Sequence, residues 1–210
     1  GDMLRLLAPI VAPGPVVGVD LSETMIDEAR HRALAVPSNV TFQVADVHTL
    51  PFDDASFDRV VSTFGHMFAP DHARTAAEMK RVLRPDGVIA VACWTPEGSI
   101  GRMFRTIVTL VPPPPGGQPP LLWGTEDHVR ELWGEAEFER HAIEWQDESV
   151  ESYARFMLDS FGPLLNAREL LAEREHELDE AFTDYLRAEN ENDDGTLRFS
   201  GEYLLSVVRP

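Results

Sequence analysis

The sequence predicts an α/β fold: a Rossmann-like, mostly parallel sheet with helices on both faces, an antiparallel last strand and a C-terminal helical lid. Between residues 16 and 94, short runs rich in β-branched residues alternate with helix-type patterns, as parallel strands with helical crossovers do. Two of these runs close on an aspartate, Asp20 and Asp46. After Trp94 the pattern is mainly helical, which indicates the lid.

The first half of the chain should hold four strands and their connecting helices. An amphipathic helix from Met3 to Ala12 comes first. The expected strands are 16–20, 40–45, 57–62 and 88–94, and the expected helices between them are 23–35 and 71–83. Ser22 and Asp71 stand at N-cap positions, because their side chains can accept from the free N–H groups of a first helical turn. The Pro85-Asp86-Gly87 turn follows the second helix and leads into the next strand.

The second half should form a cover over the sheet. Residues 112–120 are rich in proline and favour an extended conformation. We favour a stiff connector over a pocket, and a partner-recognition ligand is the alternative. Thr125 should cap a helix that ends near Trp133. The other expected elements are helices 100–111, 149–162 and 167–189 and strands 138–145 and 201–208. We therefore expect a core in 1–111, a lid and substrate region in 112–195 with one core strand near 138–146, and a final core strand in 196–210.

The composition narrows the class of partner. A chain of 210 residues can form one domain with a small lid. Its net charge of −18 argues against nucleic acid and anionic membranes, which require clustered Lys and Arg. The single cysteine, Cys93, has no partner, and no apolar stretch approaches a membrane span. We expect a cytoplasmic protein with a small-molecule substrate, and a homodimer stays open.

The two aspartates carry the functional prediction. About one strand-plus-helix unit separates Asp20 from Asp46, so they should end neighbouring strands, where a parallel sheet binds its ligand. One carboxylate can accept from two ribose hydroxyls, and the other from the exocyclic amine of adenine. Asp20 alone is equally well explained as a helix cap, and an acid after the second strand also marks nicotinamide-binding domains. The pair favours an adenosine-containing cofactor.

Four segments in this order resemble the class I S-adenosylmethionine-dependent methyltransferases, in particular the small-molecule branch that includes ubiquinone and menaquinone biosynthesis enzymes. The segments are 17–26 (VGVDLSETMI), 45–52 (ADVHTLPF), 57–62 (FDRVVS) and 78–87 (EMKRVLRPDG). The resemblance covers about residues 1–95 and implies a methyltransferase that uses S-adenosyl-L-methionine and releases S-adenosyl-L-homocysteine. It implies no metal, and the spacing of the histidines indicates none.

The resemblance also implies a role for each residue of the adenosine site. Asp20 would accept from the ribose hydroxyls and Asp46 from the adenine amino group. The backbone N–H of Val47 would meet the adenine ring, while Leu21 and Met25 would give it apolar faces. At helical spacing, Met25 is otherwise explained as a core residue.

Gly1 matches the last glycine of the family's glycine-rich turn, where a missing side chain lets the backbone approach the cofactor. The strand, acidic residue and glycines that precede it in the family have no counterpart in this sequence. Either a segment precedes Gly1, which we favour, or the sheet lacks its central strand and has a gap there. Without that segment, we expect poor affinity for the cofactor.

The transfer centre should lie after the strand 57–62. The resemblance implies that backbone near Thr63 contacts the methionine amine and that the ring of Phe64 faces the sulfonium. Methyl transfer is an in-line displacement that gains from near-attack positioning, with no covalent enzyme intermediate. His66 is the candidate general base if a hydroxyl acceptor must lose a proton, and a histidine that lines a pocket or bonds the backbone is the commoner case.

The acceptor should be small and apolar or aromatic. The aromatic residues beyond Trp94 can roof such a pocket or form the core of the lid; among them are Phe104, Trp123, Tyr153 and Phe156. O-methylation is our first expectation and C-methylation the second. One alternative is an NAD(P)-dependent oxidoreductase, although no catalytic tyrosine–lysine pair is evident. Another is a degenerate, non-catalytic interaction domain, which the missing glycine turn favours.

Overall fold

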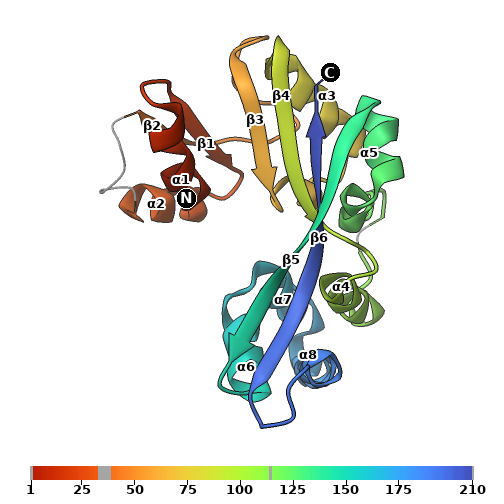
Figure 1. Cartoon of the computed structure of the whole chain (residues 1–210). Helices are drawn as coiled ribbons and strands as arrows, with labels where there is room; N and C mark the ends of the chain where they lie inside the picture. The colour runs from red at the N-terminus through yellow and green to blue at the C-terminus, as the bar shows by residue number, and fades with distance from the viewer. Residues whose placement is uncertain (1, 33–38, 114, 210) are drawn as a thin grey trace.

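The computed structural model describes all residues except 1, 33–38, 114 and 210. The elements of its N-terminal half are α1 (Asp2–Val11), β1 (Val16–Asp20), α2 (Glu23–Arg32), β2 (Val40–Val44), β3 (Phe57–Thr63), η2 (His66–Phe68), α3 (His72–Val82) and β4 (Leu83–Trp94) (Figure 1). Those of its C-terminal half are α4 (Ser99–Leu110), η3 (Pro120–Gly124), α5 (Glu126–Trp133), β5 (Ala136–Asp147), α6 (Val150–Ser160), α7 (Gly162–Leu171), η4 (Ala172–Arg174), α8 (Glu175–Glu189) and β6 (Leu197–Val208). The α/β fold with mostly parallel strands is confirmed. The predicted end of the helix 23–35 lies outside the described residues.

The strands form two sheets rather than one. β1 pairs with β2 in parallel, and a second sheet has the order β3-β4-β6-β5. In the second sheet β3 and β4 are parallel, while β6 is antiparallel to both of its neighbours, as predicted for the last strand. Among the described residues no strand joins β1 to β3, and Figure 1 shows the β1–β2 pair standing apart from β3. The described strands of the N-terminal half are therefore divided between two sheets, with β1–β2 in one and β3–β4 in the other.

Helix α1 packs against the small sheet at a glycine. Gly18 is buried in the middle of β1, and a Cβ there would lie 2.6 Å from Cδ2 of Leu4 and 3.1 Å from Cδ1 of Phe42. Ile26 and Ala29 are the buried residues of α2, which contacts both strands. The two helices therefore cover β1 and β2 and leave the carboxyl ends of these strands open.

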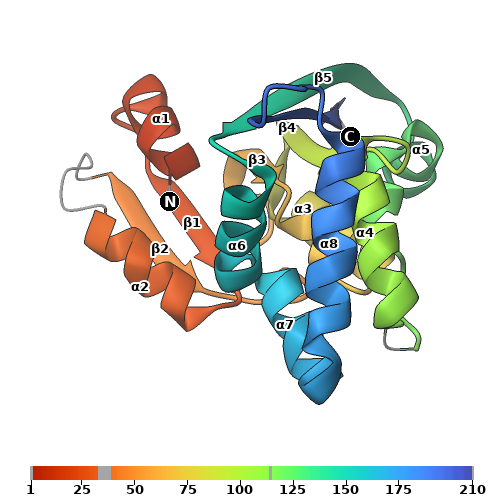
Figure 2. The ribbon, with the colours of Figure 1, turned by 90° about the horizontal axis from the view of Figure 1, so that it is seen from below.

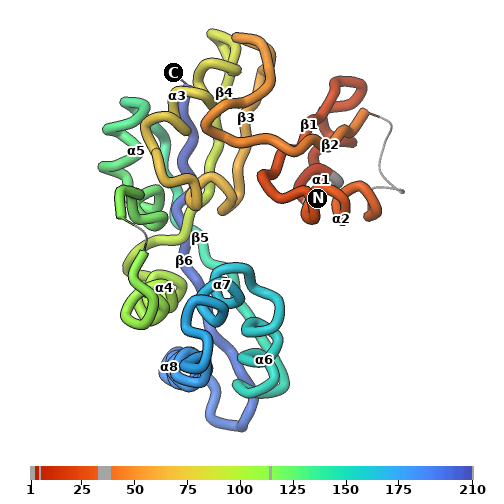
Figure 3. The backbone as a smooth tube through the Cα atoms, turned by 180° about the vertical axis from the view of Figure 1, so that it is seen from behind, coloured from red at the N-terminus to blue at the C-terminus, as the bar shows by residue number. Residues whose placement is uncertain are grey.

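Helices α3 and α5 cover one face of the larger sheet (Figure 3). The core there includes Met79, Ile89 and the fully buried Trp123. Asp71 caps α3 as predicted, because its Oδ1 accepts from the backbone N–H of Arg74 at 2.9 Å.

Thr125 precedes α5, but the expected side-chain cap is wrong. Its hydroxyl donates to the carbonyl of Leu122 at 2.7 Å instead, so it closes the turn before the helix rather than the helix itself.

The lid lies at the far end of a two-stranded ribbon. β5 and β6 pair from Ala136–Val208 to Asp147–Leu197, whereas β4 accompanies β6 only from Tyr203 onward. The ribbon therefore extends beyond the sheet to the lid helices (Figure 1), and Figure 2 shows α8 beside α4 with α6 and α7 next to it.

The single helix predicted over 167–189 is divided in two. Ala172, between α7 and α8, has a φ of 50°, which breaks the helix where no glycine or proline marks it. Arg168 of α7 then bonds Asp179 of α8, with an Nε–Oδ1 distance of 2.8 Å. The lid helices have a core of their own, with Leu164, Leu178 and Phe182 among its fully buried members.

None of the helices that the structure describes is both long enough and apolar enough to cross a membrane.

Candidate active site

Asp20 is the last residue of β1, and its exposed carboxylate uses one of its two oxygens in a hydrogen bond within the protein. Its Cα pairs with Val44 of β2, and its carbonyl accepts from the N–H of Ala45 at 2.9 Å. One carboxylate oxygen accepts from the N–H of Ser22 at 2.9 Å, and Ser22 in turn caps α2 through Met25 N at 3.3 Å. Among the described residues, the second oxygen of Asp20 has no partner. A helix-start role and a ligand role are therefore compatible.

Asp46 follows β2 by two residues and is arranged in the same way. Its Oδ1 accepts from the N–H of His48 at 2.8 Å and lies 3.0 Å from Nδ1 of the same residue. The loop after it is anchored to α3, because Leu50 donates to Glu78 and accepts from Arg81, each at 2.9 Å. Since Asp20 pairs with Val44, the structure brings both acids to the carboxyl edge of the β1–β2 pair.

Large apolar side chains surround this edge and are exposed. Leu21 is 73% exposed and Met25 57%, so Met25 is not a core residue. Val44, which pairs with Asp20, is also exposed. Val47 is half-buried at the start of the loop. Apolar side chains gathered beside two half-free carboxylates are typical of a ligand surface, and this donor and contact set fits the adenosine half of the implied cofactor.

The methionine half of the implied site is less complete. Gly1 lies outside the described residues. Thr63 is exposed at the end of β3, and Phe64 follows with a φ of 62°, the left-handed region that a side chain rarely adopts. The N–H of Phe64 donates to Ala92 at 2.9 Å, and its ring stacks on Trp94 with centroids 4.0 Å apart. One face of the Phe64 ring is therefore covered by Trp94.

His66 is a core histidine in this structure. It is 3% exposed, its Nδ1 lies 3.0 Å from the Ser62 hydroxyl, and its ring meets Trp123 edge-on at 4.7 Å. Burial, and secondarily the nearby His72, lower the pKa of His66 to about 3. Such an imidazole is neutral and a weak base. The general-base role stays a prediction, and this environment weakens it.

The sequence did not predict that two other histidines, His72 and His128, lie close to His66 in the core. His72 is fully buried, and its Nδ1 lies 2.8 Å from Nε2 of His128. Burial, then the charge of His128, lower the pKa of His72 to about 4. These histidines pack around Trp123, and His128 comes from a segment more than 50 residues after His72, so no local sequence motif indicates the cluster. Within the described part of the chain, no group of three or more His, Cys, Asp or Glu side chains is arranged to hold a metal ion.

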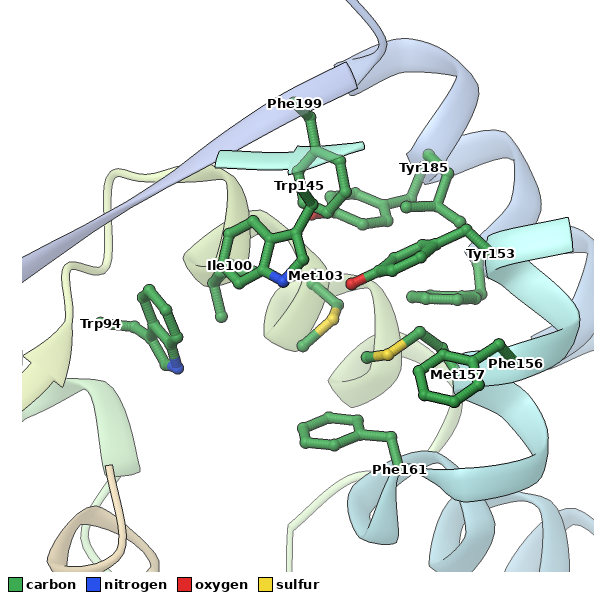
Figure 4. Close-up of a pocket in the computed structure, with 12 residues that line it drawn as sticks. Trp94, Ile100, Met103, Trp145, Tyr153, Phe156, Met157, Phe161, Tyr185 and Phe199 are labelled. Atoms are coloured by element: carbon green, nitrogen blue, oxygen red, sulfur yellow. The ribbon is translucent and has the colours of Figure 1, made fainter. Parts of the chain in front are cut away.

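A cavity opens between the ribbon and the lid (Figure 4), with a volume of about 210 Å³. Its lining is apolar and largely aromatic: Trp94, Ile100, Met103, Trp145, Tyr153, Phe156, Met157, Phe161, Phe182, Tyr185, Leu186 and Phe199. Tyr153 and Phe156, two of the aromatics expected to roof a pocket, are among them. Phe104 packs beside both cores and Trp123 is buried in the other core, so these two do not line it.

Trp94 links the cavity to the end of β3. Its ring stacks on Phe64 on one side and lies 5.6 Å from the ring of Trp145 on the other. Trp145 stacks in turn on Phe199, with centroids 5.1 Å apart. A continuous series of rings thus runs from the strand end where the sequence predicts methyl transfer into the aromatic pocket.

Comparison with known proteins agrees with this arrangement. A family model described as a methyltransferase domain matches residues 1–91. The uncharacterized Mycobacterium tuberculosis protein Rv1405c is 34% identical over 203 residues, covering 90% of this chain and 71% of its own length. A demethylmenaquinone methyltransferase of Thermus thermophilus is 34% identical over 119 residues, covering 56% of this chain and 54% of that enzyme.

A solved structure supports the fold over the whole chain. A proposed methyltransferase of Bacillus halodurans C-125 matches 100% of this chain and 88% of its own, with a TM-score of 0.64 and 20% identity. Residues 1–91 therefore form a methyltransferase domain of the class I S-adenosylmethionine-dependent type, and the chain belongs to the same family as Rv1405c.

Proposed function

We propose that this protein transfers a methyl group from S-adenosylmethionine to a small, apolar or aromatic acceptor by in-line displacement. The observation that carries the proposal is the pair of half-free carboxylates, Asp20 and Asp46, at one edge of β1–β2 beside exposed Leu21 and Met25. The aromatic pocket supports the acceptor class, because its lining offers area for apolar contact and no charged side chain.

The residues at the β1–β2 edge would hold the adenosine end of the cofactor. Asp20 would accept from the ribose hydroxyls, Asp46 from the adenine amine, and Leu21 and Met25 would cover the ring. When bound, the cofactor supplies an activated methyl group on a sulfonium centre. Thr63 and Phe64 stand at the end of β3, where that group would meet the acceptor.

The pocket residues would position the acceptor and exclude water. The indole of Trp145, stacked on Phe199, gives a flat wall against which a ring can lie. Holding the acceptor there lowers the entropy cost of bringing it to the methyl carbon. Because burial raises the pKa of Tyr153 to about 12, this phenol stays protonated and acts as a donor rather than a base. O-methylation remains the first proposal and C-methylation the second.

Calorimetry with S-adenosylhomocysteine tests the proposal. Asp20→Ala should weaken binding roughly ten- to hundred-fold, because it removes charge-assisted hydrogen bonds to the ribose. The matched control is Asp27→Ala, an exposed aspartate on α2 whose carboxylate pairs with Arg30 at 2.9 Å, and it should leave binding unchanged. An intact protein that binds no S-adenosylhomocysteine would overturn the proposal and favour the non-catalytic alternative. Equal loss in both variants would remove Asp20 from the site.

A further inference from the structure

The aromatic pocket contains a small number of polar atoms, and their partners differ. Tyr185 donates its hydroxyl to the carbonyl of Ser99 at 3.1 Å, so that group is already used inside the protein. Among the described residues, neither the Tyr153 hydroxyl nor the Trp145 indole N–H has a hydrogen-bond partner. A ligand that fills the pocket cuts these donors off from water, and a donor left unpaired in an apolar environment is costly, so the two donors are suited to a polar atom of a ligand.

The two donors face the same space. Figure 4 shows the phenol oxygen of Tyr153 and the indole nitrogen of Trp145 turned toward the open centre of the pocket, with Met103 and Met157 close by. Tyr153 is fixed by its neighbours, since it is 8% exposed and packs edge-on against Phe199 at 5.6 Å. An oxygen atom placed between the two donors can accept from both, because it has two lone pairs.

The volume and charge of the pocket limit the rest of the ligand. A cavity of about 150 Å³ holds benzene in another protein, so the 210 Å³ here suits one ring with small substituents. No charged side chain lines the cavity. The carboxylate of Asp147 is close enough to help raise the pKa of Tyr153, and it would also repel an anionic ligand. A neutral ligand is therefore favoured over a carboxylate.

We infer that this pocket binds a neutral, single-ring compound with one hydrogen-bond-accepting oxygen, such as a phenol or a ring ketone, and that Tyr153 and Trp145 recognise this oxygen. The inference deepens the proposed function, and the identification of this compound as the methyl acceptor rests on it. Tyr153 is thus a specificity-determining residue. Exposed Phe156, at 62%, lines the same pocket and leaves it open to larger substituents at that side.

Binding of three ring compounds of similar size tests the inference. 4-Methylphenol carries the oxygen, toluene lacks it, and 4-methylbenzoate is an anion. Quenching of tryptophan fluorescence, with Trp145 in the pocket wall, gives the dissociation constants for the intact chain. We expect 4-methylphenol to bind about ten-fold more tightly than toluene, and 4-methylbenzoate to bind more weakly than both.

Two tyrosine variants locate the effect. Tyr153→Phe should reduce the preference for 4-methylphenol over toluene to about three-fold, because only the Trp145 donor is left. Tyr185→Phe should keep the ten-fold preference, because its hydroxyl donates to Ser99. Trp145→Phe should reduce the preference as well and provides a second variant if one fails to fold. Equal affinities for 4-methylphenol and toluene in the unmodified protein, or an undiminished ten-fold preference in Tyr153→Phe, would overturn the inference.

The outcome is distinct from that of the cofactor test. Ring binding is measured without S-adenosylhomocysteine, so a protein that shows the Tyr153-dependent preference but no cofactor binding would refute the proposed function and leave the pocket's selectivity intact. A protein that binds the cofactor but shows no preference among the rings would refute the selectivity alone.

Discussion

Single residues at the carboxyl edge of β1–β2 can serve the structure and the proposed function together. The carboxylate of Asp20 holds its own turn through Ser22 with one oxygen, which leaves the other oxygen free at the strand end. Asp46 does the same through His48. The choice between a helix-start aspartate and a ligand-binding aspartate is therefore not exclusive. The turn contact fixes the orientation of the carboxylate before any ligand arrives, which lowers the entropy cost of binding.

At the same scale, the buried histidines should make the protein sensitive to acid. The pKa values of His66 and His72 are lowered to about 3 and about 4, from 6.5 when exposed. At a pH between the lowered pKa and 6.5, each histidine is protonated in the unfolded chain and neutral in the folded chain. The free energy of unfolding is therefore highest above pH 6.5 and falls as the pH drops toward 4. Each proton bound by the unfolded chain but not by the folded chain changes the free energy of unfolding by about 1.4 kcal/mol per pH unit.

His66→Phe should make that slope shallower by up to one proton's share, because a phenylalanine ring can keep the packing against Trp123 and takes up no proton. The measurement is the free energy of unfolding by urea at several pH values between 7 and 4. The unmodified protein, unfolded over the same pH range, is the reference. An unchanged slope in His66→Phe would contradict the assigned environment.

Elements could be predicted from the sequence where one local pattern decides them. β1 and α3 lie where the apolar runs and the Asp71 cap place them. The break between α7 and α8 could not be predicted, because it depends on Ala172 in a left-handed conformation and on packing across the lid. The extra length of β5 and β6 also escaped prediction, since each strand extends by pairing with the other, far along the chain.

The ribbon formed by β5 and β6 gives a prediction at this scale. Gly201 lies in β6 where a Cβ would come within 2.7 Å of Trp145 Cζ3 and 2.9 Å of Ile100 Cγ1. Gly201→Ala should push these side chains into the aromatic pocket, lower the free energy of unfolding by about 1–3 kcal/mol and weaken ring binding.

Urea unfolding and fluorescence quenching check both effects of Gly201→Ala. Gly162→Ala is the matched control, because a Cβ at this position in α7 meets nothing within 4 Å, and it should preserve both stability and binding. If Gly201→Ala is as stable as the original and binds the ring compounds equally well, the close contacts predicted for a Cβ at this position would be contradicted.

At the scale of the whole molecule, the proposed site is divided between two sheets. The acids Asp20 and Asp46 belong to β1–β2, whereas Phe64 and the aromatic pocket belong to the larger sheet and its lid. The sequence predicted the strand-end acids and part of the pocket lining, because motifs and aromatic residues are visible locally. It could not predict that Trp94 connects the pocket to Phe64, nor that His128 meets His66 and His72 at Trp123, because such contacts depend on the complete fold.

The central claim is that carboxylates from the ends of β1 and β2 together recognise adenosine, and a comparison of two ligands tests it most directly. S-inosylhomocysteine has a carbonyl oxygen on the purine ring at the position where S-adenosylhomocysteine has its exocyclic amine. If Asp46 accepts from that amine, the protein should bind S-adenosylhomocysteine at least about ten-fold more tightly, and Asp46→Ala should abolish the preference. Equal calorimetric affinities for the two ligands, or a preference that Asp46→Ala leaves intact, would contradict the account.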